Sequence, residues 1–466
     1  MYLHTLRLEN LKLLDDDTFS FTHADGTPRL WTVLLGDNGL CKTSVLQAIA
    51  IAASGDKLAR ALVGDAADYV RATETERGAK IVAELRTRNG PVSPARVQDP
   101  RSSLEVEMRV EPGKHDFDGH GDATWVANLR SERAPGLFVV GYGVGRYLPR
   151  PGEVAVSPDP VHDRVEGLFD TRHKMLGVDF FTALRQRNGG DRELARAYAR
   201  RIRDVLIATD PTTGERLLPW LSGVELRGYS GVDAMERLLE SQRFELEIGP
   251  LSFKLAPHQL SQGYQSVIAW ISDLLGHAFL ERGADVDPAE LEGIVLLDEI
   301  DLHLHPTWQR RVVPILRSTF PRLQFVVTTH SPLVLTGFES DEILQLQMHD
   351  DGLVRVRQTG LEPAAQSASQ LLTSYFDVPV AARPDVAAKE RDYLELKAKD
   401  SRTDDEDARL TSLGEELERY FASPLRDPRG GEHVQLDDQS VAALPLEERI
   451  RDMEAKVRAV VKSGGS

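Results

Sequence analysis

The sequence predicts an α/β fold in which a mostly parallel sheet is covered by helices on both faces. Short, continuously apolar segments such as GIVLLDE and LQFVVTTH alternate with helical patterns such as TWQRRVVPILRSTF, and parallel strands need helical connections that bury both faces of the sheet. In addition, the strand-like segment LWTVLL ends at Gly36 and is followed at once by the helical pattern KTSVLQAIAIAA. The order strand, glycine-rich turn, helix is a local arrangement that can bind phosphate.

The composition limits the kinds of protein that this chain can be. Its 466 residues are enough for two domains or for one domain with large insertions. With 56 Lys and Arg against 73 Asp and Glu, the net charge is −17, so any DNA contact needs a local basic patch. The single cysteine, Cys41, rules out an intrachain disulfide. Because we find neither a secretory signal in MYLHTLRLEN nor a bilayer-length apolar run, we expect a cytoplasmic protein with no membrane partner.

Local patterning predicts each element of the first half. The first 35 residues contain three strand-like segments, YLHTLRLENLKLL, DDTFSFTHADGTPR and LWTVLL. Between about residues 80 and 145 we expect further strands at IVAEL, SSLEVEMRV, ATWVANL and GLFVVGYG. From about 162 to 240 the pattern is helical, most clearly in DRELARAYARRIRDVLIA and VDAMERLLESQ.

The second half returns to alternating elements. FELEIGPLSFKLAP predicts strands, SQGYQSVIAWISDLLGHAFLE a long helix, and EILQLQMHDDGLVRVRQ a hairpin turning at DDG. Beyond about residue 362 the chain is charged and mostly helical, with a linker before a last helix. That helix has an apolar seam too short to be stable alone, so it needs a surface in its own domain or on a partner. The seam residues are Leu446, Ile450, Met453, Val457 and Val460.

The turn from Gly36 to Thr43 fits the phosphate-binding pattern G-x-x-x-x-G-K-[ST], except that Cys41 replaces the last glycine. Small residues let backbone N–H groups surround phosphates, Lys42 reaches the β- and γ-phosphates, and the Thr43 hydroxyl ligates Mg²⁺. A glycine-rich turn without a ligand remains the alternative for this loop alone. A helix N-terminus beside Lys42 also predicts a lowered pKa for the Cys41 thiol. The predicted loop contacts are Gly36, Asn38, Gly39, Cys41, Lys42, Thr43 and Ser44.

Three later segments strengthen the nucleotide interpretation. The strand IVLLDE ends in Asp298 and Glu299, which predicts one carboxylate for Mg²⁺ and one to polarise the attacking water. LSQGYQS opens a helix and offers Ser261 and Gly263, and TTHSP places His330 after an apolar strand. Taken alone, each segment has a structural explanation, such as a helix cap or a packed histidine. Their order and spacing together favour a nucleotide site.

These residues resemble the ABC-type ATPase heads of the RecF/SMC class, and within it the stand-alone AAA-family ATPases of bacterial defence. The resemblance covers about residues 1 to 360, where LSQGYQS is similar to the signature LSGGQ and DEIDLHLHP to the segment D-E-x-x-x-H-L-H-P. It implies an ABC-ATPase (P-loop NTPase) head with a core at 1–160 and 250–360 and a compact helical insertion lobe at 161–249. A helical C-terminal extension would follow at 361–466, with its linker at about 423–445.

The same resemblance implies ATP and Mg²⁺ as cofactors at composite sites between the protomers of a homodimer or higher homo-oligomer. Lys42, Thr43 and Asp298 would hold Mg-ATP, Glu299 would act as the base, and His330 would sense the γ-phosphate. Ser261 and Gly263 would close the site of the other protomer. The histidines 303 and 305 could form a metal pair, but the resemblance places them in a loop that faces the partner.

Two positions depart from the pattern of these heads. Cys41 is one of them. The other departure is a missing glutamine, which these heads usually carry after the strand that corresponds to GLFVV. The sequence has no glutamine from 99 to 185, and Tyr142 to Arg146 occupies the expected place. Arg146 could contact phosphate or metal-bound water, or it could be a salt-bridged structural arginine. Both departures favour, modestly, a nucleotide-dependent scaffold that does not hydrolyse ATP.

The size, the helical tail and SASQLLTSYFDV most resemble the ATPase subunit of Septu-type anti-phage systems, which acts with a separate HNH nuclease. We expect no nuclease activity in this chain, because the acidic run 404–407 follows Thr403 as a helix start and not a strand. Double-stranded DNA could contact a stripe formed by Arg196, Arg200 and Arg203 near arginines 185, 187 and 192, although a solvated, ion-paired face is the alternative. A RecF-like DNA repair ATPase also remains open.

Overall fold

The computed structural model describes residues 1–148, 163–226 and 242–421, with gaps at 89, 94–98, 132–136, 174, 177–191, 359, 361, 367, 377–383 and 398–402. The chain divides into two compact units, Met1–Gln366 and Ser367–Ser466, which are described separately. The predicted linker at about 423–445, the apolar seam after it and the segment VDAMERLLESQ, apart from its last residue, lie outside the described residues. Within the described part, no helix is both long and apolar enough to cross a bilayer.

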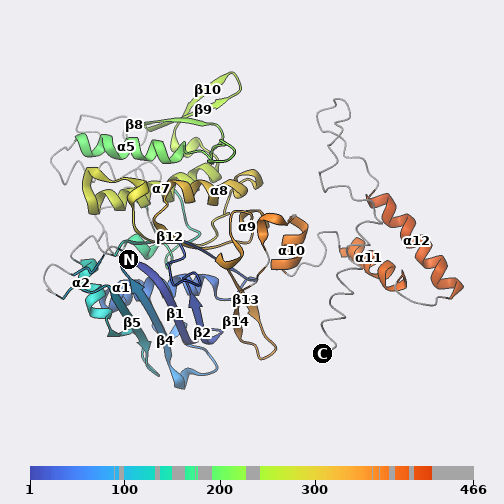
Figure 1. The fold of residues 1–466 in the computed structure, drawn as a ribbon, viewed down its shortest axis with the longest axis horizontal. Helices are drawn as coiled ribbons and strands as arrows, with labels where there is room; N and C mark the ends of the chain where they lie inside the picture. The colour runs from blue at the N-terminus through green and yellow to red at the C-terminus, as the bar shows by residue number, and fades with distance from the viewer. Residues whose placement is uncertain are drawn as a thin grey trace. The chain divides into compact units, whose positions relative to one another are not determined.

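Among the described residues of the first unit, eleven strands form one mixed sheet (Figure 1). Strands β7, β11, β12, β3 and β13 run parallel, while β6, β5, β4, β1 and β2 are antiparallel neighbours. A single residue pair, Val354 with Leu14, joins the two halves through β14 and β2. In spatial order the strands are β6 (Asp118–Gly121), β5 (Ser103–Val110), β4 (Ala79–Arg86), β1 (Tyr2–Leu11), β2 (Leu14–Ser20), β14 (Val354–Gln358), β13 (Ile343–Met348), β3 (Trp31–Leu35), β12 (Leu323–Thr328), β11 (Gly293–Leu297) and β7 (Val139–Tyr142).

The apolar strands lie where their patterning predicts. Every residue of β3, β11 and β12 is buried, as expected for parallel strands covered on both faces. The predicted hairpin at EILQLQMHDDGLVRVRQ is confirmed as the antiparallel pair β13 and β14. The α/β fold class predicted from the sequence is therefore confirmed.

One expected strand is a helix. The segment ATWVANL lies in α2 (Ala123–Ser131), which packs against α1 (Lys42–Leu62). A Cβ added at Gly55 of α1 would lie 2.6 Å from the carbonyl oxygen of Ala123, so the two backbones approach very closely there. Gly55 also has non-helical angles, φ 72° and ψ 179°, that interrupt α1 at this contact. Tertiary packing, which the local pattern does not show, decides the outcome.

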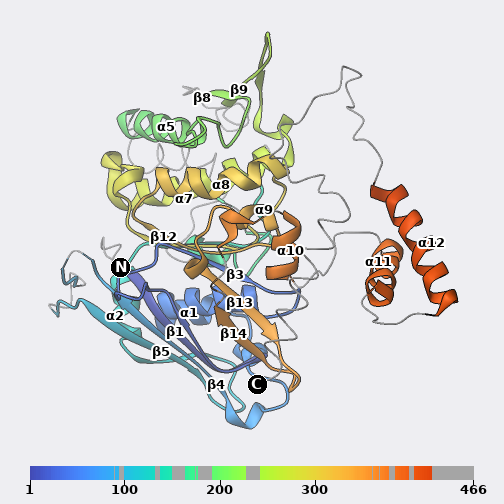
Figure 2. The same cartoon turned by 45° about the vertical axis from the view of Figure 1, so that its right-hand side comes forward.

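A helical layer covers the parallel strands on the side opposite α1 (Figures 1 and 2). In it, α5 (Arg192–Leu206) packs on α7 (Gln262–Arg282): the Tyr198 hydroxyl donates to the Ser272 carbonyl at 2.8 Å and its ring meets Phe279 edge-on. Both helices were predicted. Among the described residues, the other α-helices of the first unit are α3 (Asp163–Glu166), α8 (Pro306–Thr319) and α9 (Pro332–Leu335).

A small antiparallel sheet of β8 (Leu221–Leu226), β9 (Gln242–Ile248) and β10 (Leu251–Leu255) accompanies this layer. Strands β9 and β10 were predicted, whereas β8 falls in the region from about 162 to 240, whose sequence pattern predicts helices. Val224 pairs with Phe244 across the β8 and β9 register. A strand pairing of this kind depends on a partner far along the chain, which a local helical pattern cannot reveal.

The second unit contains three described helices, α10 (Ala368–Phe376), α11 (Pro384–Lys397) and α12 (Asp404–Phe421). Ion pairs between Lys389 and Glu416 and between Arg409 and Asp392 join α11 to α12. The predicted helix start at Thr403 is confirmed: its N–H donates to Glu406 at 3.0 Å and its hydroxyl accepts from the Glu406 N–H at 3.3 Å.

Candidate nucleotide site

The loop between β3 and α1 forms the centre of the candidate site. Its residues Asp37, Asn38 and Gly39 are exposed, and Gly39 has φ 85° with no atom within 4 Å of an added Cβ. The Lys42 ammonium lies across the inside of the loop and donates to the carbonyls of Gly36 at 2.6 Å and Asp37 at 2.9 Å. Burial lowers the pKa of Lys42, although the nearby carboxylates oppose that shift. The loop therefore has the open backbone and the inward lysine that phosphate binding requires.

Cys41 takes the left-handed conformation that its motif position demands. Its φ is 63° and its ψ is 13° at the N-cap of α1, where a glycine would fit without strain. Cys41 is 8% exposed, and burial raises the pKa of its thiol, with smaller opposing effects from the Leu13 backbone and from the charge of Lys12. The expectation of a lowered pKa was wrong, because desolvation of the buried thiol outweighs the lowering effects of the Leu13 backbone and of the Lys12 charge.

The carboxylate of Asp298 lies at the end of β11, where it accepts two hydroxyl hydrogen bonds. Thr43 at the start of α1 donates to Oδ2 at 2.8 Å, and Thr328 at the end of β12 donates to Oδ1 at 2.6 Å. Parallel pairing of β3, β12 and β11 brings these three chain segments to one edge of the sheet. Carboxylate and hydroxyl oxygens are ligands that Mg²⁺ prefers, so the donors present fit a magnesium–nucleotide complex.

Glu299 follows directly and is held in an unusual backbone conformation. Its φ of 48° lies in the left-handed region, which a residue with a Cβ adopts at a cost of about 1 kcal/mol or more. The Glu299 N–H donates to the Thr328 hydroxyl at 2.7 Å, and its carbonyl accepts from Arg146 at 2.7 Å. Thr328 thus contacts both acidic residues and fixes one relative to the other.

His330 leaves the same edge of the sheet after β12. Its side chain is exposed, while its backbone N–H donates to Asp301 at 3.4 Å. The neighbouring Thr329 hydroxyl also donates to Asp301, and the Ser331 hydroxyl donates to Gln309 at 2.7 Å. These bonds tie the segment around His330 to the loop that follows Glu299 and to α8.

The predicted signature residues lie at the start of α7, in the helical layer. Ser261 is the exposed N-cap of that helix, and Gly263 is buried where an added Cβ would lie 2.6 Å from the His303 carbonyl. Within one chain, the fold brings four of the predicted site residues together, namely Lys42, Thr43, Asp298 and Glu299. Ser261 lies apart from them, at the exposed start of α7. His303 is exposed, whereas His305 accepts a hydrogen bond from the Thr307 N–H and caps α8.

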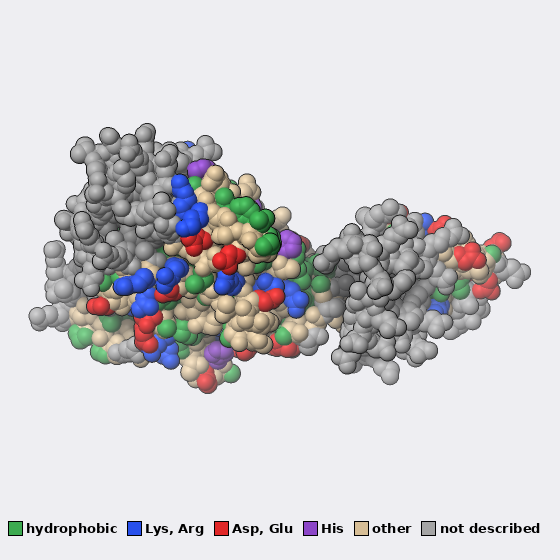
Figure 3. Space-filling model, turned by 90° about the horizontal axis from the view of Figure 1, so that it is seen from above, with side chains coloured by type: hydrophobic (Ala, Val, Ile, Leu, Met, Phe, Trp, Pro, Cys, Tyr) green, Lys and Arg blue, Asp and Glu red, His purple; other side chains and the backbone are tan. Residues whose placement is uncertain are grey.

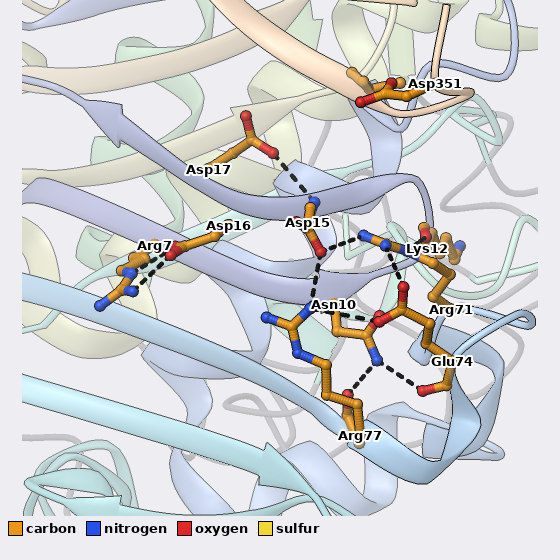
Figure 4. A network of polar contacts seen from close by, with 12 residues as sticks. Arg7, Asn10, Lys12, Asp15, Asp16, Asp17, Arg71, Glu74, Arg77 and Asp351 are labelled. Atoms are coloured by element: carbon orange, nitrogen blue, oxygen red, sulfur yellow. Dashed lines mark hydrogen bonds and ion pairs between the residues drawn. The ribbon is translucent and has the colours of Figure 1, made fainter. Parts of the chain in front are cut away.

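Lys12 was not identified from the sequence. It occupies the β1–β2 turn at φ 53°, and its ammonium donates to the Ser44 hydroxyl at 3.0 Å and lies over the Tyr69 ring. Figure 4 shows how Arg71, Asn10 and their neighbours brace this turn: Arg71 donates to the Lys12 carbonyl at 3.2 Å. No local motif marks Lys12, because its place beside α1 results from the pairing of distant segments.

The arginine stripe on α5 is described only in part. Arg200 and Arg203 are exposed, and Arg203 donates to the neighbouring Asp204 at 3.0 Å. The Arg196 and Arg192 side chains and the residues 185 and 187 lie outside the described part of the structure. On the face of the first unit seen in Figure 3, Lys and Arg side chains are interspersed with Asp and Glu.

The fold, with this loop between β3 and α1 and the acidic pair after β11, is that of an α/β P-loop ATPase head. Residues 198–336 match the family described as "AAA domain, putative AbiEii toxin, Type IV TA system". The chain is similar to Septu protein PtuA of Bacillus mycoides (strain KBAB4), with 25% identity over 436 residues, which are 93% of this chain and 53% of that protein. The predicted resemblance to Septu-type ATPases is thereby confirmed.

Two further similarities cover other shares of the chain. The Retron Ec83 probable ATPase of Escherichia coli is 40% identical over 128 residues, which are 27% of this chain and 24% of that protein. This chain therefore spans about half, or less, of the length of these relatives. Among solved structures, the chain is similar to the Smc head bound to the C-winged helix domain of ScpA. The match covers 78% of this chain and 99% of the Smc head chain, with 17% sequence identity and a TM-score of 0.49.

Proposed function

We propose that this chain binds Mg-ATP and hydrolyses it at sites shared between two copies of the chain. The observation that carries the proposal is the junction of Thr43, Asp298 and Thr328 beside the inward Lys42. Lys42 binds the β- and γ-phosphates, and Thr43 and Asp298 are the residues that would hold Mg²⁺. When bound, Mg²⁺ neutralises charge on the phosphate oxygens.

The remaining roles belong to side chains around that junction. The Glu299 carboxylate orients the attacking water and accepts its proton. His330 contacts the γ-phosphate from the exposed end of β12. Ser261 is exposed at the N-terminus of α7, so its N–H and hydroxyl are available to a nucleotide held by a second copy.

We further propose that ATP-driven closure regulates a separate nuclease, of the HNH type, in an anti-phage defence system. The similarity to Septu protein PtuA along 93% of this chain supports this role, and the similarity to a retron probable ATPase agrees with it. Contact with double-stranded DNA through α5 is part of the proposal. A RecF-like repair ATPase and a non-hydrolysing scaffold are the alternatives.

Glu299→Gln tests the central step. We expect ATP binding to persist, phosphate release to fall by roughly 10²-fold or more, and a dimer to form that lasts longer in Mg-ATP. Lys42→Ala should lose nucleotide binding. Ser261→Arg should still fold and bind ATP, because Ser261 is exposed, but it should remain a monomer, because the larger side chain prevents contact with the nucleotide of a second copy. Light scattering and phosphate release measure these outcomes.

Each alternative gives a different result. Unchanged phosphate release in Glu299→Gln would show that Glu299 is not the base. ATP binding without phosphate release in the wild type would support the scaffold. If Ser261→Arg associates as the wild type does, the sites are not shared. Co-purification with an HNH nuclease, compared with a RecF-like partner set, tests the defence role.

A further inference from the structure

Arg146 is a buried arginine in the segment after β7, where the resemblance to ABC-type heads led us to expect a glutamine. Only 2% of the residue is exposed. Its position depends on the glycines before it: an added Cβ at Gly143 would lie 2.3 Å from the Gly167 carbonyl, and one at Gly145 would lie 2.1 Å from the Thr171 carbonyl. The loop after β7 therefore packs backbone to backbone on residues 167–171 and directs Arg146 inward.

The guanidinium of Arg146 contacts two parts of the candidate site. It donates to the carbonyls of Asp298 and Glu299, the latter at 2.7 Å, and its Nε donates to the Ser266 hydroxyl at 3.4 Å. An arginine guanidinium is charged at neutral pH and offers several N–H donors in a fixed planar fork. A charged donor to two carbonyls of one turn makes stronger bonds than a neutral donor would.

These contacts hold the Glu299 residue from both sides. Its N–H donates to Thr328 on β12, and its carbonyl accepts from Arg146 after β7. Such a strained residue keeps its conformation only where the surroundings determine it. The third contact, Ser266, lies in the first turns of α7, three residues beyond Gly263 and five beyond Ser261.

We propose that Arg146 is a positioning residue that holds Glu299 in its catalytic conformation and connects it to the start of α7. The proposal rests on the ATPase function proposed above. In a closed dimer, Ser261 meets the nucleotide of the second copy, while Glu299 serves the nucleotide of its own chain. Arg146 and Ser266 therefore join the two sites of the dimer through a single chain.

Arg146→Met and Arg146→Lys test the positioning role. For Arg146→Met we expect kcat to fall about 10²-fold, while the Kd for a fluorescent ATP analogue stays within about threefold of the wild type. Arg146→Lys should recover part of kcat, because lysine still donates to one carbonyl but lacks the fork that reaches both. Thermal unfolding measured without nucleotide shows whether each variant is folded.

A double mutant separates action through Glu299 from general damage. In Glu299→Gln, adding Arg146→Met should leave the residual phosphate release unchanged, since groups that act as a unit have non-additive effects. Ser266→Ala should reduce the cooperativity of hydrolysis with ATP concentration. Ser272→Ala is the matched control, because Ser272 is buried on the same helix and its described contact is through its carbonyl.

The outcomes are distinct from those of the proposed function. The positioning role is refuted if Arg146→Met keeps kcat within about threefold, loses ATP affinity in parallel, or lowers the residual rate further in Glu299→Gln. Equal effects of Ser266→Ala and Ser272→Ala refute the connection to α7. If Glu299→Gln itself does not slow phosphate release, the proposed function fails first and independently.

Discussion

Thr328→Val removes one hydroxyl that contacts both acidic residues of the site. In the wild type this buried hydroxyl donates to Asp298 at 2.6 Å and accepts from the Glu299 N–H at 2.7 Å. Valine keeps the shape but leaves both groups without that partner. Losing a bond to a carboxylate costs about 1.5–3 kcal/mol, and an unsatisfied N–H about 1 kcal/mol more, so we expect a total loss of about 2.5–4 kcal/mol.

Thr32→Val is the matched control on the adjacent strand β3. Thr32 is also fully buried, but within the described residues its hydroxyl makes no hydrogen bond. Replacing an unsatisfied hydroxyl by a methyl group should be neutral or stabilising by about 1 kcal/mol. All five tryptophans lie in the first unit, so their fluorescence in urea reports the unfolding of that unit.

Phosphate release should fall at least tenfold in Thr328→Val, since Glu299 loses one of its two anchors, and should be unchanged in Thr32→Val. Unfolding free energies of the two variants that agree within about 0.5 kcal/mol would refute the reasoning, because that result would mean that the Thr328 hydrogen bonds contribute nothing net.

The remaining predictions concern two buried residues, Cys41 and Tyr142. Because burial raises the pKa of Cys41, a thiol reagent should react with it far more slowly in the folded protein than in urea, and faster as the pH rises above the usual thiol range. Because the thiol ionises at a lower pH in the unfolded chain than in the folded protein, Cys41 also makes the free energy of unfolding fall as the pH rises above the usual thiol pKa. Equal reaction rates with the thiol reagent in the folded and the unfolded protein would contradict the slow reaction expected of the folded protein. Cys41→Gly should bind ATP with an affinity within about tenfold of the wild type. If the wild type binds no ATP and Cys41→Gly does, this prediction is wrong. Tyr142→Phe removes a 3.0 Å bond to the buried Asp273 carboxylate and should cost about 1.5–3 kcal/mol, more than Tyr198→Phe, which loses a bond to a neutral carbonyl; urea unfolding compares the two, and equal losses would contradict it.

The sequence predicts those parts of the site that depend on local order. Three continuously apolar segments predict parallel strands, and parallel strands bring their carboxyl ends to one edge of the sheet. The positions of Gly36, Asp298 and His330 just after these segments therefore predict that they lie close together. The helical α2 could not be predicted, since its conformation depends on contact with Gly55 about seventy residues earlier. The partners of Arg146 were hidden for the same reason: they lie 120 and more residues away.

The order of strands in the sheet also determines when the phosphate loop can form during synthesis. Strand β3 (Trp31–Leu35) lies between β12 and β13, whose residues begin only at Leu323 and Ile343. A ribosome that has made the first half of the chain has supplied the antiparallel strands with their partners, but β3 still lacks both of its neighbours. About three hundred more residues are therefore synthesised after the loop that follows β3 before both strands that pair with β3 are present. If the chain binds nucleotide as proposed, it acquires that affinity late in synthesis, when the acidic pair and His330 have also been made.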